Sequence, residues 1–183
     1  EGFGGAAAAM VFRFLHPGEY GIVEPEGSPR PFRNKLVAEF IGTFFLVLTV
    51  GLSVLQPDNH AAAYAIASAL MVMIYSVAHL SGGHLNPAVT VAFFATERNI
   101  ISARDAAWYI ASQVSGGLAA AVVFTSCTPH GNFALGPPEG WSWIGVVATE
   151  GFYTFMLCYV VLAVSSYSKD MFGLAIGWVV LAG

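Results

Sequence analysis

The sequence predicts an all-α membrane protein, a bundle of membrane-spanning helices that includes a re-entrant half-helix. Of its 183 residues, 56% are hydrophobic and only 10% are charged. Because a soluble domain carries about a quarter charged residues, this composition indicates a chain embedded in lipid. Four apolar runs are long enough to cross a bilayer, and one much shorter run begins at an Asn-Pro-Ala sequence.

The first 35 residues are predicted to form an arm on the cytoplasmic side, outside the membrane domain. Residues 2–15 are small and apolar but too few to span a bilayer, which takes about 20 residues. We expect them to form a disordered or surface-lying arm, or else to belong to a segment processed from a longer precursor. Residues 18–33, which contain prolines and several charges, are expected to form an irregular loop.

Residues 36–183 are predicted to form the membrane domain, with four full spans, one half-helix and part of a fifth span. The full spans are expected at residues 36–55, 61–80, 105–126 and 142–167, separated by polar or proline-rich turns. Asp105 is placed to cap the start of the third span. The fifth span begins at Met171 and reaches only Gly183, so we expect a domain that is incomplete at its C-terminus.

The half-helix is predicted to run from Pro87 to Ala95. Asn86 can cap it by accepting a backbone hydrogen bond, and proline suits the first helical position because it leaves no N–H unpaired there. Gly82 and Gly83 allow the sharp turn that comes before it. A helix that stops half way across a membrane is tolerated only where it lines a cavity or is buried in protein. Its positive N-terminal end is then expected near the bilayer midplane.

The basic residues predict how the chain crosses the membrane. With these spans, all seven fall on one side: Arg13, Arg30, Arg33, Lys35, Arg98, Arg104 and Lys169. Positive residues favour the cytoplasmic side, so the N-terminus is expected there. The same layout requires the half-helix to return to the side from which it came. The membrane itself is expected to be the plasma membrane or that of an organelle.

An internal repeat links the first and fourth spans. Residues 39–46 read EFIGTFFL and residues 150–157 read EGFYTFML, so Glu, Thr, Phe and Leu recur at the same spacing. An odd number of crossings separates the two copies, so the second enters the membrane from the opposite side. The pattern therefore predicts an inverted repeat, an architecture typical of channels and transporters.

These motifs together resemble the aquaporin, or major intrinsic protein, family. The resemblance rests on Glu39 with Thr43, on residues 81–90 (SGGHLNPAVT) and on Glu150 with Thr154, and it covers roughly residues 35–183. It implies an aquaporin-like bundle of six spans, two half-helices that meet at the midplane, and a homotetramer with one pore per subunit. This chain stops before the second Asn-Pro-Ala sequence that the family carries.

The resemblance also implies roles for residues along a pore. Asn86, followed by Pro87 and Ala88, would donate a side-chain hydrogen bond to water passing in single file; the alternative is that Asn86 serves only as a helix cap. His84 would line the cytoplasmic vestibule or bond within its loop. Ile66 matches the narrowing position of the second span, where water-selective members carry an aromatic residue, so a less aromatic constriction is expected.

Glu39 and Glu150 are charged residues inside apolar runs, which is costly in a membrane and is by default a hint of function. One interpretation is a proton relay. The resemblance favours a structural role instead, in which each buried carboxylate accepts hydrogen bonds from re-entrant backbone that has no other partner.

The predicted function is a passive channel for water or small neutral solutes that excludes protons and ions. The alternative is an aquaporin-like structural subunit of a larger membrane complex, with lost or reduced pore function. The sequence shows no nucleophile–base pair, metal-ligand set or phosphate loop, so we predict no enzyme activity, catalytic residue, metal or cofactor. Without a basic patch that carries interleaved aromatic residues, it does not suggest nucleic-acid binding. The expected partners are the solute, the lipid bilayer, and copies of this chain or subunits of a larger complex.

Overall fold

The computed structural model describes residues 2–20, 31–56, 59–97, 100–128, 136–137, 140–167 and 170–182, and only the backbone of Tyr167. Arg30, Arg98 and Lys169, on which part of the predicted topology rests, lie outside these residues. Most of the predicted loops at residues 18–33 and 128–140 also lies outside them.

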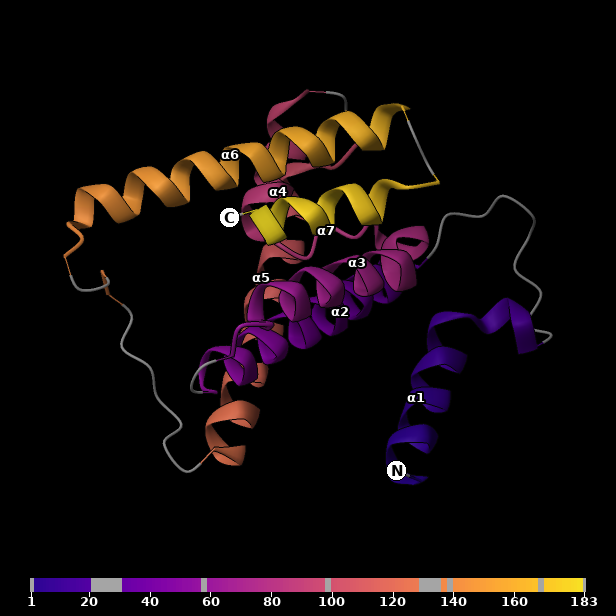
Figure 1. Ribbon diagram of the computed structural model, residues 1–183. Helices are drawn as coiled ribbons and strands as arrows, with labels where there is room; N and C mark the ends of the chain where they lie inside the picture. The colour runs from indigo at the N-terminus through magenta and orange to yellow at the C-terminus, as the bar shows by residue number, and fades with distance from the viewer. Residues whose placement is uncertain are drawn as a thin grey trace.

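Every regular element in the described residues is a helix, which confirms the predicted fold class (Figure 1). The elements are α1 (Gly2–Leu15), η1 (Pro17–Tyr20), α2 (Phe32–Val54), α3 (Ala62–Ser81), α4 (Pro87–Ala95), α5 (Ala103–Cys127), α6 (Trp143–Tyr167) and α7 (Phe172–Ala182). Four of them, α2, α3, α5 and α6, are long and apolar enough to cross a membrane. The half-helix α4 has the predicted bounds, whereas α2 begins at Phe32, before the predicted start of the first span.

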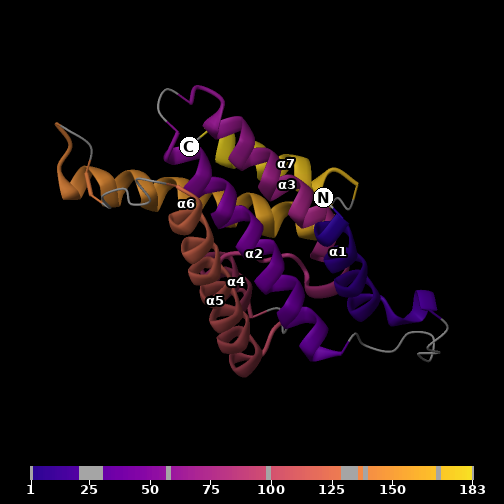
Figure 2. The same ribbon diagram turned by 90° about the horizontal axis from the view of Figure 1, so that it is seen from below.

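Helix α2 lies between α5 and α3 (Figure 2). Helix α7 packs against α3 and α6, and the short α4 packs against α5 and α6. Aliphatic and aromatic side chains from these helices form one core, with Ala38, Leu70, Ile74, Val77, Leu80, Leu85, Val89, Phe93, Val161 and Ile176 among its buried members. This packing encloses the segment that joins α3 to α4.

Two helix pairs approach closely because one partner presents a glycine. A Cβ atom on Gly116 of α5 would lie 2.5 Å from the carbonyl oxygen of Phe40 in α2. One on Gly177 of α7 would lie 2.8 Å from the carbonyl oxygen of Ala67 in α3. Small residues at such crossings are the usual way for membrane helices to pack backbone against backbone.

Two local predictions differ from the structure. The cap of α5 is Ser102, whose hydroxyl accepts a 3.1 Å hydrogen bond from the backbone nitrogen of Asp105. Asp105 therefore lies in the first turn, where its charge complements the helix dipole. Residues 2–15 form the helix α1, so the disordered alternative for this arm is wrong, whereas the surface-lying alternative stays a prediction. Its C-terminal end is fixed to α2, because the side-chain nitrogen of Asn34 donates to the carbonyl oxygens of Phe14 and Leu15 at 3.3 and 3.5 Å.

Candidate functional site

The centre of the molecule is the re-entrant segment of residues 82–86, which leads from the end of α3 to the start of α4. Gly82 and Gly83 have φ angles of 95° and 64°, in the left-handed region that glycine adopts freely. Leu85 also has a positive φ, of 49°, although it carries a side chain. A non-glycine residue holds such a backbone only where the surrounding structure fixes it.

The carboxyl group of Glu39 holds this segment from the side of α2. Its Oε1 accepts hydrogen bonds from the Ser81 hydroxyl at 2.6 Å and from the backbone nitrogen of His84 at 3.0 Å. Its Oε2 accepts from the backbone nitrogen of Leu85 at 2.7 Å and from the side-chain nitrogen of Gln113 at 2.8 Å. Glu39 is completely buried, so these four donors stand in for water. The structural role expected for Glu39 requires donors of this kind, and it stays a prediction.

Further backbone groups in and next to the segment also have partners. The hydroxyl of Thr43 donates to the carbonyl oxygen of Leu85 at 3.2 Å. The hydroxyl of Tyr109 donates to the carbonyl oxygen of Ser81 at 2.8 Å. The backbone nitrogen of Gly83 donates to the Ser81 hydroxyl at 3.1 Å. Irregular backbone inside a membrane must find such partners within the protein, and here α2, α3 and α5 supply them.

Thr90 joins the half-helix to the same network. Its hydroxyl accepts a 2.9 Å hydrogen bond from the side-chain nitrogen of Gln113 and donates to the carbonyl oxygen of Asn86 at 3.2 Å. The Nδ1 atom of His84 lies 3.1 Å from the same hydroxyl, and the imidazole stacks on the ring of Phe93 at a centroid distance of 4.5 Å. These contacts fix the orientation of α4 relative to α2 and α5.

Asn86 caps the half-helix as predicted. Its Oδ1 accepts a 2.8 Å hydrogen bond from the backbone nitrogen of Ala88, and Pro87 occupies the first helical position. Because the side-chain oxygen of Asn86 accepts the capping hydrogen bond, its amide nitrogen is the group that can donate a hydrogen bond to a passing molecule.

A cavity of about 480 Å³ brings four of the predicted site residues together. Ile66, His84, Asn86 and Glu150 line it, and most of the remaining wall is aliphatic. His84 also lines a second cavity of about 480 Å³, with Lys35, His79, Asp105 and Tyr109 among its other lining residues. Glu39 lines neither cavity. Among the residues that the structure describes, no cluster of three or more His, Cys, Asp or Glu is placed to hold a metal ion.

Glu150 corrects one prediction, because it is exposed where a buried carboxylate was expected. Helix α6 joins the core from Leu157 onward, while its first half extends away from the other helices (Figure 1). Glu150 lies on that first half and faces a cavity rather than a re-entrant backbone segment. The two halves of the sequence repeat are therefore packed differently in the described residues.

The sequence prediction missed Gln113 and Tyr109, which complete the network around Glu39. Both lie in the third predicted span, and Gln113 is an uncharged polar side chain in the middle of that apolar run. A polar residue inside a span tends to face the bundle interior, and this was the available signal. Its partners lie on α2 and α4, far away in the sequence, so only the assembled bundle identifies its role.

Replacing Gly42 with alanine is expected to destabilise the bundle. The added methyl group would overlap the side chain of Leu85, which is 1% exposed and held at both its backbone nitrogen and oxygen. Such overpacking typically costs about 1–3 kcal/mol. We expect a lower midpoint of thermal unfolding in detergent.

The matched control is Gly117→Ala. A Cβ at Gly117 would lie 3.7 Å from its nearest neighbour, on Val47, which is an ordinary contact. This control gains the same methyl group in a helix, so its midpoint of thermal unfolding should equal or exceed that of the unaltered protein. Equal midpoints for the two variants would show that Leu85 is not tightly held.

Comparisons with known proteins cover most of the chain. Residues 27–183 match the family model described as major intrinsic protein. The chain is 36% identical to aquaporin NIP1-1 of Arabidopsis thaliana over 169 residues, which is 82% of this chain and 56% of that protein. It is 32% identical to nodulin-26 of Glycine max over 161 residues, 80% of this chain and 58% of that protein. It is 35% identical to glycerol uptake facilitator protein-like 6 of Lactiplantibacillus plantarum over 155 residues, 79% of this chain and 70% of that protein. The chain thus spans little more than half the length of the first two relatives.

Proposed function

Because this chain belongs to the major intrinsic protein family, we propose that it is a passive channel for water or small neutral solutes. The observation that carries the proposal is the position of Asn86, which caps a half-helix inside the bundle and lines a cavity with Ile66 and His84. The names of the plant aquaporins and of the bacterial glycerol uptake facilitator support this solute class. Transport of this kind requires no catalytic group, cofactor or energy source.

In the proposed mechanism, Asn86 donates a hydrogen bond from its amide nitrogen to each water molecule that passes in single file. A water molecule oriented in this way cannot relay a proton along the file. The first turn of α4 presents its positive end at the same place and repels cations. Pro87 and Ala88 keep that turn compact, and His84 stands between this cavity and the second one.

Ile66 is proposed as a selectivity residue, and Ile66→Phe tests this role. An aromatic ring in the cavity wall narrows the path, so we expect glycerol uptake by proteoliposomes to fall more than osmotic water permeability. Val72→Phe, at an exposed position on the same helix, is the matched control and should change neither rate. Equal losses of water and glycerol transport in Ile66→Phe would contradict a role in selectivity.

The wider arrangement is proposed on the same basis. Residues 36–183 form the membrane domain of an integral multi-pass protein, and residues 1–35 form an arm on the cytoplasmic side. Arg33, Lys35 and Arg104 all lie near the ends of α2 and α5 that this orientation places in the cytoplasm. By family membership, we propose a homotetramer in which each subunit has its own pore, located in the plasma membrane or an organellar membrane.

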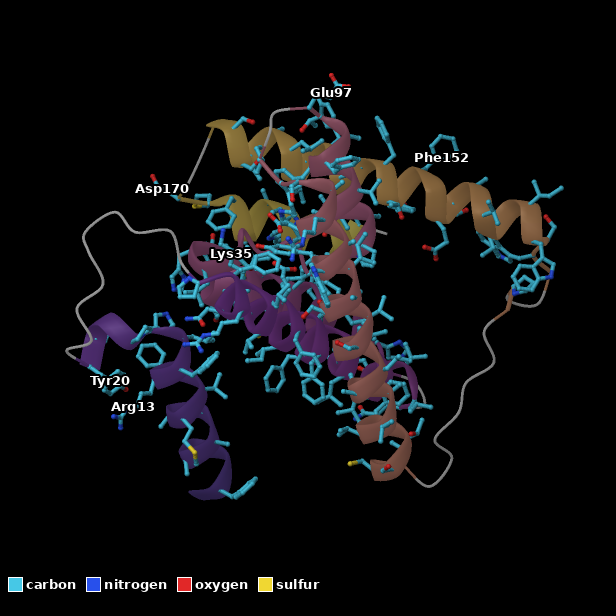
Figure 3. All side chains as sticks on the ribbon, turned by 180° about the vertical axis from the view of Figure 1, so that it is seen from behind. Arg13, Tyr20, Lys35, Glu97, Phe152 and Asp170 are labelled. Atoms are coloured by element: carbon cyan, nitrogen blue, oxygen red, sulfur yellow. The ribbon has the colours of Figure 1, made fainter. Side chains whose placement is uncertain are left out.

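The second candidate is a structural subunit of a larger membrane complex, and one observation favours it. The first half of α6 exposes large apolar side chains, Phe152, Phe155 and Ile144 among them, and it extends away from the other helices (Figure 3 labels Phe152). Such a face suits a neighbouring subunit as well as lipid. Osmotic permeability of proteoliposomes separates the two candidates. A rate well above that of protein-free vesicles supports the channel, and a rate equal to it favours the structural subunit.

A further inference from the structure

Most of helix α1 touches nothing else in the described chain. Phe3 is 88% exposed and Met10 is 69% exposed. A Cβ atom built on Gly2, Gly4 or Gly5 would meet no atom within 4 Å. Figure 1 shows α1 standing beside the bundle, apart from the other long helices.

Water is a poor solvent for this helix. Isolated helices shorter than about 12–15 residues are marginal in water even when they are rich in alanine. Helix α1 has 14 residues, and Gly2, Gly4 and Gly5 in its first turns weaken it further. An apolar solvent instead stabilises the helical form. In such a solvent each backbone N–H and C=O group must find its hydrogen-bond partner within the segment, and a helix provides these partners.

The side chains of α1 match a lipid environment on every face. Its exposed large side chains are all apolar: Phe3, Met10, Val11, Phe12 and Phe14. Arg13, in the last turn, is the only charged residue of the helix. Phe3, Met10 and Phe14 share one face of the helix, at spacings of seven and four residues, and Phe12 lies on the opposite face. Apart from Arg13, the other residues are glycine, alanine, valine and leucine, so no face of α1 is polar.

Positive charge gathers at one end of α1. The Arg13 guanidinium lies 5.3 Å from the centre of the Tyr20 ring (Figure 3). The Arg33 guanidinium lies 5.2 Å from the centre of the Phe14 ring. Lys35 follows one turn into α2, and Glu19 is the one acidic residue of α1 and η1. Basic and aromatic residues at such a level suit the anionic headgroups of a membrane surface.

We propose that α1 is embedded in the lipid leaflet on the side of the membrane where α2 begins. Its apolar body lies among the acyl chains, and Arg13 and Arg33 lie at the level of the phosphates. Its C-terminal end is fixed to the bundle by the buried Leu15 and by the hydrogen bonds from Asn34. The arm is therefore a lipid anchor for the cytoplasmic end of the bundle, and the inference does not depend on transport activity.

Fluorescence quenching in proteoliposomes tests this placement. In a full-length chain that carries Cys127→Ser and Cys158→Ser, Met10→Cys is labelled with bimane and reconstituted into vesicles of phosphatidylglycerol and phosphatidylcholine. We expect brominated acyl chains to quench the label and aqueous iodide to have no effect. Phe3→Cys, labelled in the same way, should behave alike.

Glu19→Cys is the matched control, because Glu19 lies just beyond the charged end of the helix and is exposed. Its label should be quenched by iodide and not by the brominated chains. Iodide quenching of the Met10→Cys label would place α1 in water and overturn the proposal. Protection from both quenchers would show that protein covers α1, either a second copy or another segment, and would also overturn it.

Discussion

Replacing Glu39 with leucine is expected to prevent most of the protein from folding. The substitution removes the acceptor for four hydrogen bonds while the donors, among them the backbone nitrogens of His84 and Leu85, stay buried. Each buried donor left without a partner costs about 1–3 kcal/mol. Gln113 still bonds Thr90, and Ser81 still bonds the carbonyl oxygen of Val77, so the backbone nitrogens of His84 and Leu85 carry the loss. Two such losses, about 2–6 kcal/mol, are a large part of the stability of a typical domain, about 5–15 kcal/mol. The yield of monodisperse protein after extraction in detergent measures the effect.

Glu39→Gln is the control, because it keeps the shape of the side chain and one acceptor oxygen. Among the described residues, the buried Oε1 of Gln113 has no hydrogen-bond partner. It can turn to accept from the new amide nitrogen, although its bond to Thr90 is then lost. One backbone donor, at His84 or Leu85, also loses its acceptor, so we expect a smaller loss of yield than with leucine, and retained permeability. If the yield is normal and permeability alone is lost, Glu39 acts on protons and the structural role is wrong.

Replacing Ala88 with tryptophan is expected to reduce osmotic permeability to that of protein-free vesicles. Ala88 lies in the first turn of α4, between Asn86 and Val89, which both line the cavity. An indole ring at this position fills the space beside the Asn86 amide. Because Ala88 is only half-buried, the helix can form with the larger side chain in place. Stopped-flow light scattering of proteoliposomes after an osmotic step measures the rate.

Val91→Trp is the matched control for this experiment. Val91 lies on the same half-helix and is 52% exposed, so the same indole ring is added away from the cavity. This variant should conduct as the unaltered protein does. Both variants must be reconstituted at equal protein content, verified by quantitative blotting. Unchanged permeability of Ala88→Trp under these conditions would refute the proposed path beside Asn86.

The half-helix could be predicted from the sequence because its signals are local. Asn86 and Pro87 are adjacent, and the charged residues that follow Ala95 limit its length, so neighbouring residues alone determine where it begins and ends. The four spans could be predicted equally well from the sequence, since each is a continuous apolar run. The structural role of Glu39 came from the family resemblance instead, and it stays a prediction.

The remaining features depend on contacts between distant segments. Gln113 became recognisable as a partner of Glu39 only when α5 was packed on α2. Glu150 repeats the motif of Glu39, yet the repeat alone does not reveal that the first half of α6 extends from the core. Residues 2–15 were expected to be disordered or surface-lying because they are small and apolar but too few to span a bilayer. The end of α1 is held against α2 by Asn34, which lies about 20 residues further along the chain.

The network around Glu39 also dictates an order of events during synthesis. Glu39 and Gln113 are 74 residues apart, so α2, α3 and α4 emerge from the ribosome before α5 does. Until then the carboxyl group lacks one of its four donors, and Thr90 lacks the amide that links it to α2. The network can therefore be completed only after α5 has packed on α2. The cap on Asn86 needs only the backbone nitrogen of Ala88, so α5 completes the support around the half-helix rather than its start.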